Sequence, residues 1–361
     1  MQAEDLGCTQ FGTPFPPPNS DAARNSVFLR VITIVVETYQ PIHFYLYVTL
    51  VAFSVFANFT ILLVLTQKEM RSVGVNVTMM LIAICDFSCS VAAAAQQFLR
   101  STETYKSYFN AYARLTVDYL AVAFHALSLY LAVGMAFSRA MSLTFSSINR
   151  DKWQTPKYSL RIAFIWWLPV FLVASLSLQM NTVKESEELG IYTDVSDLAL
   201  ENHCLFMKLF LITNGVCFKA IPCILMFSFS LFLFAKIHAG QQRSLGIISN
   251  QRGKNEQIER SVRFIQFVLV LSVITELPPA ILSIIGGLFV IDYINYYQKF
   301  ASIISALSIF NTTLSFIIYS SLSAKFRQLF FQIFLPETVH ARIYQKTSVL
   351  VQPKASSFQT L

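Results

Sequence analysis

Charged residues are scarce in this chain of 361 residues. Asp, Glu, Lys and Arg together make up 13% of it, whereas hydrophobic residues make up 55%. Soluble domains carry about 25% charged residues, so the composition excludes an ordinary soluble domain. The apolar runs are also continuous, whereas the strands of a membrane β-barrel alternate apolar and polar residues over about ten positions. The composition therefore predicts an all-α membrane protein.

Motifs typical of several other protein classes are absent. No C-x-x-C pair occurs among the six cysteines, so no zinc site is indicated, and no H-E-x-x-H or nucleophile motif indicates an enzyme. The amino-terminal segment lacks the basic start and apolar core of a cleavable signal peptide. No inverted repeat or pair of broken helices favours a membrane transporter, which is the alternative from a different class.

Seven apolar segments are long enough to cross a bilayer as helices, which takes about 20 residues. They run over His43–Thr66, Val75–Phe98, Ala111–Leu143, Tyr158–Met180, Cys204–His238, Val262–Phe289 and Gln298–Leu322. We therefore predict a seven-transmembrane helix bundle over residues 42–323. The polar, proline-rich residues 1–41 are expected to form a disordered extracellular tail.

The distribution of charge predicts the orientation of the bundle. The loops after the first, third and fifth segments are rich in Lys and Arg, which is typical of cytoplasmic loops. The loop after the fourth segment carries Glu185, Glu187, Glu188, Asp194, Asp197 and Glu201 against Lys184 alone. We therefore expect a multi-pass protein of the plasma membrane with an extracellular amino terminus. Cytoplasmic Lys and Arg explain the net charge of +7, so no nucleic-acid partner is needed.

A further helix is predicted after the seventh segment. From Phe326 to Phe334, apolar residues recur at three- and four-residue spacing, while Lys325 and Arg327 lie on the other side. This pattern is typical of an amphipathic helix that lies along the membrane surface. We assign it residues 324–336, because Pro336 ends it, and we assign residues 337–361 to a cytoplasmic tail.

The third segment places Asp118, His125, Ala132 and Arg139 near one face, because they recur every seven residues. From Asp118 to Arg139 a helix rises about 31 Å, which matches the hydrocarbon thickness. Asp118 is therefore expected at the outer mouth and Arg139 at the cytoplasmic edge. His125 is either a hydrogen-bonded structural residue or the floor of a ligand pocket.

Four polar residues are expected to meet at mid-membrane: Asp86, Ser128, Asn311 and Ser315. Hard cations take oxygen ligands of this kind, so the four could hold a hydrated sodium ion at Asp86. The alternative is a polar network without an ion, in which Asp86 is protonated. Apart from this possible sodium ion, the sequence indicates no cofactor and no firm metal site.

The sixth segment combines one acid with a proline kink. Between Phe264 and Phe289 the only charged residue is Glu276, and Pro278 follows it closely. An ionisable residue at membrane depth is costly and is a functional hypothesis by default. Glu276 pairs either with Lys219 of the fifth segment or with a cationic group of a ligand. The acidic loop after the fourth segment favours a cationic ligand, such as an amidated peptide bearing arginine, or is merely solvated.

Cysteines indicate one disulfide. Cys8 and Cys204 are the two that fall in expected extracellular segments, where thiols tend to oxidise. We predict that they form a bridge that ties the amino-terminal tail over the mouth of the pocket. The other four lie in apolar segments, where thiols usually only pack.

Several stretches resemble those of a known receptor family. They include ANFTILLVLTQKEMRS, SLYLAVGMAFSRAMSL, GVCFKAIPCIL, TELPPAIL and FNTTLSFIIYSSLSAKFR, in this order. From about Ala57 to Phe330 the chain resembles the nematode serpentine chemoreceptors of class W. These are similar to FMRFamide-type neuropeptide receptors of the rhodopsin-like G-protein-coupled receptor superfamily. The resemblance implies an external neuropeptide or other chemosensory ligand, or a small odorant molecule, and a cytoplasmic heterotrimeric G protein.

The resemblance also implies roles for single residues. Arg139 matches the arginine at the G-protein cleft, and Asp86 matches the acid of the sodium site. Pro222 and Pro278 match the kinks of the fifth and sixth spans. Tyr319 matches the tyrosine of the seventh-span switch.

The chain departs from the superfamily pattern at several positions. The usual Asp-Arg-Tyr is Ser138-Arg139-Ala140, so the carboxylate beside the arginine is missing. Glu276 replaces the switch tryptophan before the sixth-span proline. Arg114 stands where a cysteine is expected at the top of the third span, so the usual loop disulfide is unavailable to Cys204.

Overall fold

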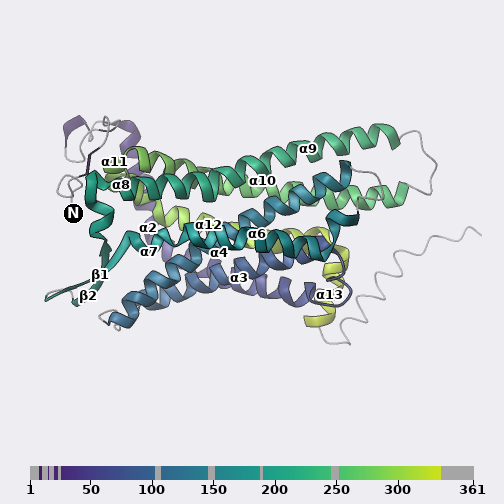
Figure 1. Ribbon diagram of the computed structural model, residues 1–361, viewed down its shortest axis with the longest axis horizontal. Helices are drawn as coiled ribbons and strands as arrows, with labels where there is room; N and C mark the ends of the chain where they lie inside the picture. Colours follow the sequence, from purple (N-terminus) through teal and green to yellow (C-terminus); the bar gives the residue numbers. More distant parts are fainter. Residues whose placement is uncertain are drawn as a thin grey trace, which may run out of the picture.

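The structure is a computed structural model that describes residues 8–9, 15, 20–22, 26–101, 107–144, 151–187, 190–244 and 252–334. Within these ranges, seven helical spans are long and apolar enough to cross a membrane. They run side by side along the long axis of the molecule (Figure 1). The predicted all-α class and seven-transmembrane helix bundle are confirmed.

The spans differ in how many helices build them. The first three are α2 (Val27–Leu65), α3 (Gly74–Ser101) and α4 (Tyr108–Thr144), and the fourth is α6 (Pro156–Ala174) with α7 (Leu176–Met180). The fifth joins α8 (Asp197–Thr213), the π-helix η4 (Asn214–Ala220) and α9 (Ile221–Ser244). The sixth is α10 (Arg252–Leu288), and the seventh is η5 (Tyr297–Phe300) with α12 (Ala301–Leu322). Shorter helices are η3 (Asp151–Gln154), α11 (Val290–Asn295) and α13 (Ala324–Phe334).

The first span begins at Val27, well before the predicted start at His43. Ser26 caps the helix, because its Oγ accepts a hydrogen bond from the backbone N–H of Leu29 at 3.4 Å. The extra turns bury Leu29 and its apolar neighbours in a cluster with Tyr296, at the outer end of the seventh span. The prediction of a disordered tail up to residue 41 is therefore wrong for residues 27–41.

A two-stranded hairpin follows the fourth span, where the sequence indicated only an acidic loop. Strand β1 (Asn181–Ser186) pairs antiparallel with β2 (Gly190–Val195). Lys184 Nζ lies 3.2 Å from Asp197 Oδ1 and 3.4 Å from Asp194 Oδ2, and these partners raise the pKa of Lys184, chiefly through the hydrogen bond to Asp197. The hairpin projects at the same end of the molecule as α8 and α11 (Figure 1).

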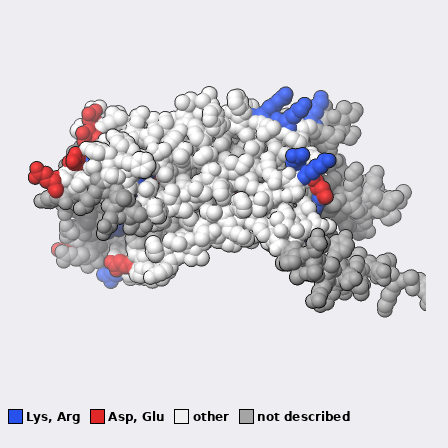
Figure 2. Space-filling model, turned by 90° about the horizontal axis from the view of Figure 1, so that it is seen from below, with Lys and Arg blue, Asp and Glu red and all other residues white. Residues whose placement is uncertain are grey.

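Charge separates along the molecule as the orientation requires. On the face in Figure 2, acidic side chains gather at one end, most basic side chains lie at the other, and the belt between them is almost uncharged. Large apolar side chains are also exposed along α6, among them Phe164, Trp167 and Leu172. Exposed apolar surface of this extent is stable in lipid and not in water. The protein is therefore a multi-pass membrane protein.

Helix α13 occupies the position of the predicted eighth helix. Phe326 is completely buried and packs its ring against those of Phe316 and Tyr319 of the seventh span. Lys325 lies 3.4 Å from Glu69, beyond the inner end of the first span. These contacts attach α13 to the bundle, while its placement along a membrane surface stays a prediction.

Candidate functional site

One fully buried acid and two largely buried basic groups meet between three spans. Glu276 of α10 has no exposed side-chain surface, and its Oε2 lies 2.7 Å from Nζ of Lys219 in η4. Its Oε1 lies 3.1 Å from Nε2 of His125 in α4, a close contact that is not aligned as a hydrogen bond. One carboxylate thus faces two basic groups, and the alternative in which Glu276 pairs with Lys219 is the arrangement that the structure adopts.

The π-helix η4 explains how Lys219 reaches Glu276. In η4 the N–H of Ile221 bonds the carbonyl of Val216, five residues earlier, and Pro222 has no N–H to bond the carbonyl of Cys217 in the same register. The free carbonyl of Cys217 instead accepts a hydrogen bond of 2.6 Å from the Tyr130 hydroxyl of α4. π-Helices are rare and are frequently found at functional sites. Here the irregular turn directs Lys219 into the bundle.

Close packing of the fifth and sixth spans supports the same contact. A Cβ atom on Gly215 of η4 would lie 2.7 Å from the Ile284 side chain and 2.9 Å from the Ile284 backbone nitrogen. A glycine is therefore needed for the two spans to approach this closely. One turn outward, Ser283 Oγ donates a 2.8 Å hydrogen bond to the carbonyl of Leu211. The outer halves of the two spans are thus joined above the pair.

Asp118 lies on the same helix as His125, seven residues nearer the outer surface. This separation corresponds to about 10 Å of helix rise. Asp118 is half-buried, and its Oδ1 has no hydrogen-bond partner in the described part of the chain. Arg100 and Arg114 act electrostatically on its carboxylate. Asp118 therefore does not join the Glu276 cluster but lies above it.

The four residues of the predicted sodium site are only partly brought together. Asp86 is buried, and its Oδ1 accepts a 2.7 Å hydrogen bond from Ser128. Asn311 Oδ1 instead accepts a 3.2 Å hydrogen bond from Thr275 of the sixth span. Among the described residues, no hydrogen bond joins Asn311 or Ser315 to Asp86. Asp86 and Ser128 supply oxygen atoms of the kind that hard cations bind. Asn311 and Ser315 do not hydrogen-bond to them in the described part of the chain.

A network of hydroxyl groups lies beside Asp86 and links the first, second and seventh spans. Ser54 Oγ lies 2.6 Å from Ser90 Oγ and 2.6 Å from Thr312 Oγ1. Asn58 donates a 3.0 Å hydrogen bond to the carbonyl of Thr312, and Ser90 donates to the carbonyl of Asp86 at 2.7 Å. The sequence did not indicate these hydroxyl contacts, since Ser and Thr in helices usually bond only their own backbone.

Two of the residues assigned to G-protein coupling, Arg139 and Tyr319, lie near each other. Tyr319 of α12 donates a 3.3 Å hydrogen bond to Asn76 Oδ1 of α3. Its hydroxyl also interacts electrostatically with Arg139 of α4. Pro278 lies inside α10, one turn inward of Ser283 and close to Glu276. Arg139 and Tyr319 therefore lie close together, whereas Pro278 lies at the level of the Glu276 cluster.

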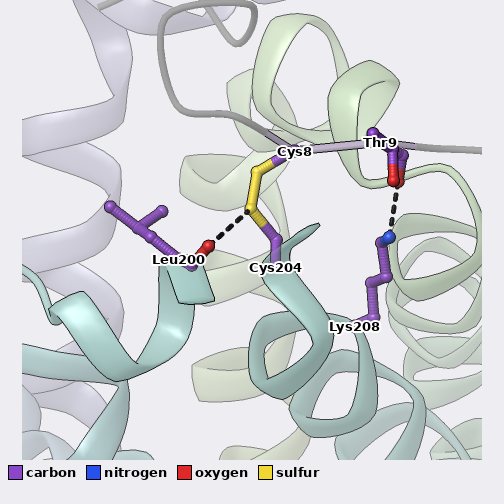
Figure 3. Close-up of a disulfide and its surroundings, with 5 residues drawn as sticks. All are labelled: Cys8, Thr9, Leu200, Cys204 and Lys208. Carbon is purple, nitrogen blue, oxygen red and sulfur yellow. Dashed lines mark hydrogen bonds between the residues drawn. A yellow bond between two sulfur atoms is a disulfide. The ribbon is translucent and has the colours of Figure 1, made fainter. Parts of the chain in front are cut away.

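A disulfide joins Cys8 to Cys204 of α8, with a Cα–Cα distance of 5.2 Å (Figure 3). Next to it, Lys208 Nζ donates a hydrogen bond to the carbonyl of Thr9. Cys204 ends a left-handed turn in which Asn202, His203 and Cys204 have φ of 49°, 58° and 65°. Such residues cost roughly 1–2 kcal/mol each when they are not glycine. The disulfide attaches residues 8–9 to this strained turn.

Comparison with known proteins identifies the family. The sequence profile described as "Serpentine type 7TM GPCR chemoreceptor Srw" matches residues 44–336. The chain belongs to this family. The Srw receptor is 23% identical to "G-protein coupled receptor dmsr-1" of Caenorhabditis elegans over an alignment of 389 residues. This alignment covers 93% of this chain and 76% of that protein. It is 24% identical to "Sex peptide receptor" of Drosophila melanogaster over an alignment of 337 residues. This alignment covers 83% of this chain and 74% of that protein.

Family membership confirms the predicted resemblance and the predicted class of function. The Srw receptor is a G-protein-coupled receptor and not an enzyme. It therefore takes an extracellular ligand and acts through a G protein. The contact of His125 with Glu276 was not predicted. The seven-residue spacing indicated only that His125 and Asp118 lie on one face of the third span.

Proposed function

We propose that this Srw receptor binds a cationic neuropeptide at its extracellular end and transmits binding to a heterotrimeric G protein at the plasma membrane. The acidic β1–β2 hairpin carries this proposal. Glu185 and Glu187 are exposed there, and Asp194 and Asp197 both pair with Lys184, so residues 181–187 and 190–197 carry four acids against one lysine. A field of one sign attracts ligands of the opposite charge and raises their association rate. One relative is named as a receptor for a peptide, which supports the same ligand class.

The sixth span is proposed to carry the signal. Glu276, Pro278 and Pro279 lie together in α10, so the helix holds its buried acid where proline interrupts its hydrogen bonds. Ligand binding between the third, fifth, sixth and seventh spans would favour one of two pre-existing states. In the active state the inner part of α10 swings, and the G protein docks at Arg139.

A sodium ion at Asp86 is proposed as a modulator of this equilibrium. Asp86 and Ser128 supply the two oxygen ligands that lie together, and the bound ion would favour the inactive state. The competing arrangement is the same network without an ion.

The orientation proposed from the loop charges also has structural support. The disulfide Cys8–Cys204 belongs on the oxidising, extracellular side of a membrane. Lys152, Lys157 and Arg161, at and just before the inner end of the fourth span, belong on the cytoplasmic side.

One assay tests the ligand class. Cells that display the receptor are exposed to a library of short cationic peptides, to neutral peptides of the same lengths, and to small volatile molecules, while G-protein activation is recorded. The proposal expects activation by cationic peptides and a loss of potency when Glu185, Asp194 and Asp197 are changed to Asn or Gln. Activation by volatile molecules alone identifies an odorant receptor and contradicts the peptide proposal.

A further inference from the structure

Among the described residues, the buried cluster around Glu276 leaves N–H donors of Lys219 unused. Both oxygens of the carboxylate already face a basic group of the chain, Lys219 at 2.7 Å and His125 at 3.1 Å. A lysine ammonium has three N–H donors, and the Glu276 contact uses one of them. His125 Nδ1 is buried without a hydrogen-bond partner in the described part of the chain. Within the same residues, two N–H donors of Lys219 are therefore unused, and His125 Nδ1 is a further polar atom without a partner.

Unsatisfied donors of this kind require an acceptor. A buried polar group without a partner costs about 1–3 kcal/mol, and more when it is charged. The side chains of Lys219 and His125 each keep 12% of their surface exposed, whereas Glu276 keeps none. A small group that enters the bundle therefore meets the two basic side chains and does not reach the carboxylate.

The charges further outward do not reverse this preference. Asp118 lies about 10 Å above His125 along α4, and the carboxylate is influenced by two cations, Arg100 and Arg114. Glu276 in turn faces Lys219. Each of these two carboxylates therefore has basic side chains of the chain close to it, in contrast to the acidic hairpin at the entrance.

We propose that Lys219 and His125 form a subsite for a hydrogen-bond acceptor of the ligand, a carboxylate or an amide carbonyl, with Glu276 as the residue that positions both. This inference rests on the proposed function, because it assigns the ligand group that penetrates deepest into the receptor. The acidic hairpin attracts the cationic part of a peptide, and the subsite receives its carbonyl-bearing end. A ligand amine is thus excluded from Glu276.

The test uses matched peptide probes. Arginine-containing tetrapeptides are made in three forms: with a terminal carboxylate, with a terminal carboxamide, and with the last residue replaced by the corresponding alkylamine, which lacks the terminal carbonyl. Each form is assayed for potency of G-protein activation on cells with verified surface expression. On the wild-type receptor, the carbonyl-bearing forms are expected to be about tenfold more potent than the alkylamine form, the usual effect of a hydrogen bond to a charged group.

The variants separate recognition from folding. Lys219→Met alone leaves Glu276 without its closest partner, so the double variant Lys219→Met/Glu276→Gln is assayed beside it. In the double variant, and in His125→Phe, the potency ratio between the carbonyl-bearing and alkylamine forms is expected to fall towards one. Lys299→Met is the matched control, because Lys299 is exposed at the outer end of the seventh span, and its ratio should stay at the wild-type value.

The outcomes distinguish this inference from the receptor proposal. Peptide activation with the same ratio in the wild type and the double variant overturns the subsite and leaves the peptide receptor standing. Preference for a peptide amine that disappears in Glu276→Gln overturns the subsite in favour of direct recognition by the carboxylate. No activation by any peptide on a receptor present at the cell surface overturns the proposed function itself.

Discussion

Lys219 Nζ and Glu276 Oε2 lie 2.7 Å apart and join the fifth span to the sixth at a depth where lipid surrounds the bundle. One charge in the middle of each of two apolar segments was enough to propose this pair from sequence, since an unpaired charge at membrane depth is rare. The distance has a consequence for stability, because each group depends on the other to remain charged in the bundle.

The first prediction is therefore a double-mutant cycle on this pair. Glu276→Gln and Lys219→Met should each lower the free energy of unfolding by about 3–5 kcal/mol, because each leaves the partner charge uncompensated. The double variant should lose less than the sum of the two. Thermal unfolding of the purified receptor and its surface level in cells measure the effect, and simple additivity in both would reject the coupling.

The second prediction concerns the disulfide. Cys8→Ser should lower the stability of the extracellular end and the potency of the agonist, because residues 8–9 then no longer secure the left-handed turn at Asn202–Cys204. Disulfides typically contribute about 2–4 kcal/mol. Hydrogen exchange of α8 and alkylation followed by mass mapping provide the measurements. Cys217→Ser is the control, since Cys217 is a free cysteine. Alkylation of both Cys8 and Cys204 without prior reduction would contradict the bridge.

The third prediction concerns Asp86. If Asp86 and Ser128 hold sodium, agonist affinity should fall as sodium replaces potassium at constant ionic strength, since the ion favours the inactive state. Asp86→Asn should abolish this dependence while the hydroxyl network around Ser54 and Thr312 is kept. A wild-type affinity that is the same in both salts would leave only the ion-free network.

The fourth prediction concerns helix packing at the π-helix. Gly215→Ala should destabilise the receptor by about 1–3 kcal/mol, because the new methyl group meets the Ile284 backbone. Gly134→Ala is the matched control: all the atoms nearest to its Cβ belong to the Ile162 side chain, which can shift. Thermal unfolding of both variants should show the larger loss for Gly215→Ala. Equal losses of stability in the two variants would contradict the claim that the close approach of the fifth and sixth spans at η4 requires a glycine.

The features predicted from sequence are those that depend on local composition. Apolar length predicts the seven spans, and isolated charges predict the pairing of Lys219 with Glu276. The features that were missed depend on contacts distant in sequence. Helix α2 extends to Val27 because its outer turns pack on Tyr296. The π-helix follows from Pro222 together with the hydrogen bond from Tyr130, which a single segment does not reveal.

The hairpin and the arrangement of the predicted sodium-site residues were also not predictable from local sequence. Strands β1 and β2 are six residues each and were hidden by their acidic content, which indicated a loop. Of the four polar residues expected to converge, Asn311 turned instead to Thr275, because side-chain direction on a helix depends on the neighbouring span.

The most direct test of the account as a whole is ligand-dependent G-protein activation by the wild-type receptor and by Arg139→Ala, at equal surface expression. Arg161→Ala is the control, since Arg161 is exposed on α6. The account predicts that a cationic peptide activates the wild type and Arg161→Ala, whereas Arg139→Ala binds the peptide but activates no G protein. Full activation through Arg139→Ala would contradict it.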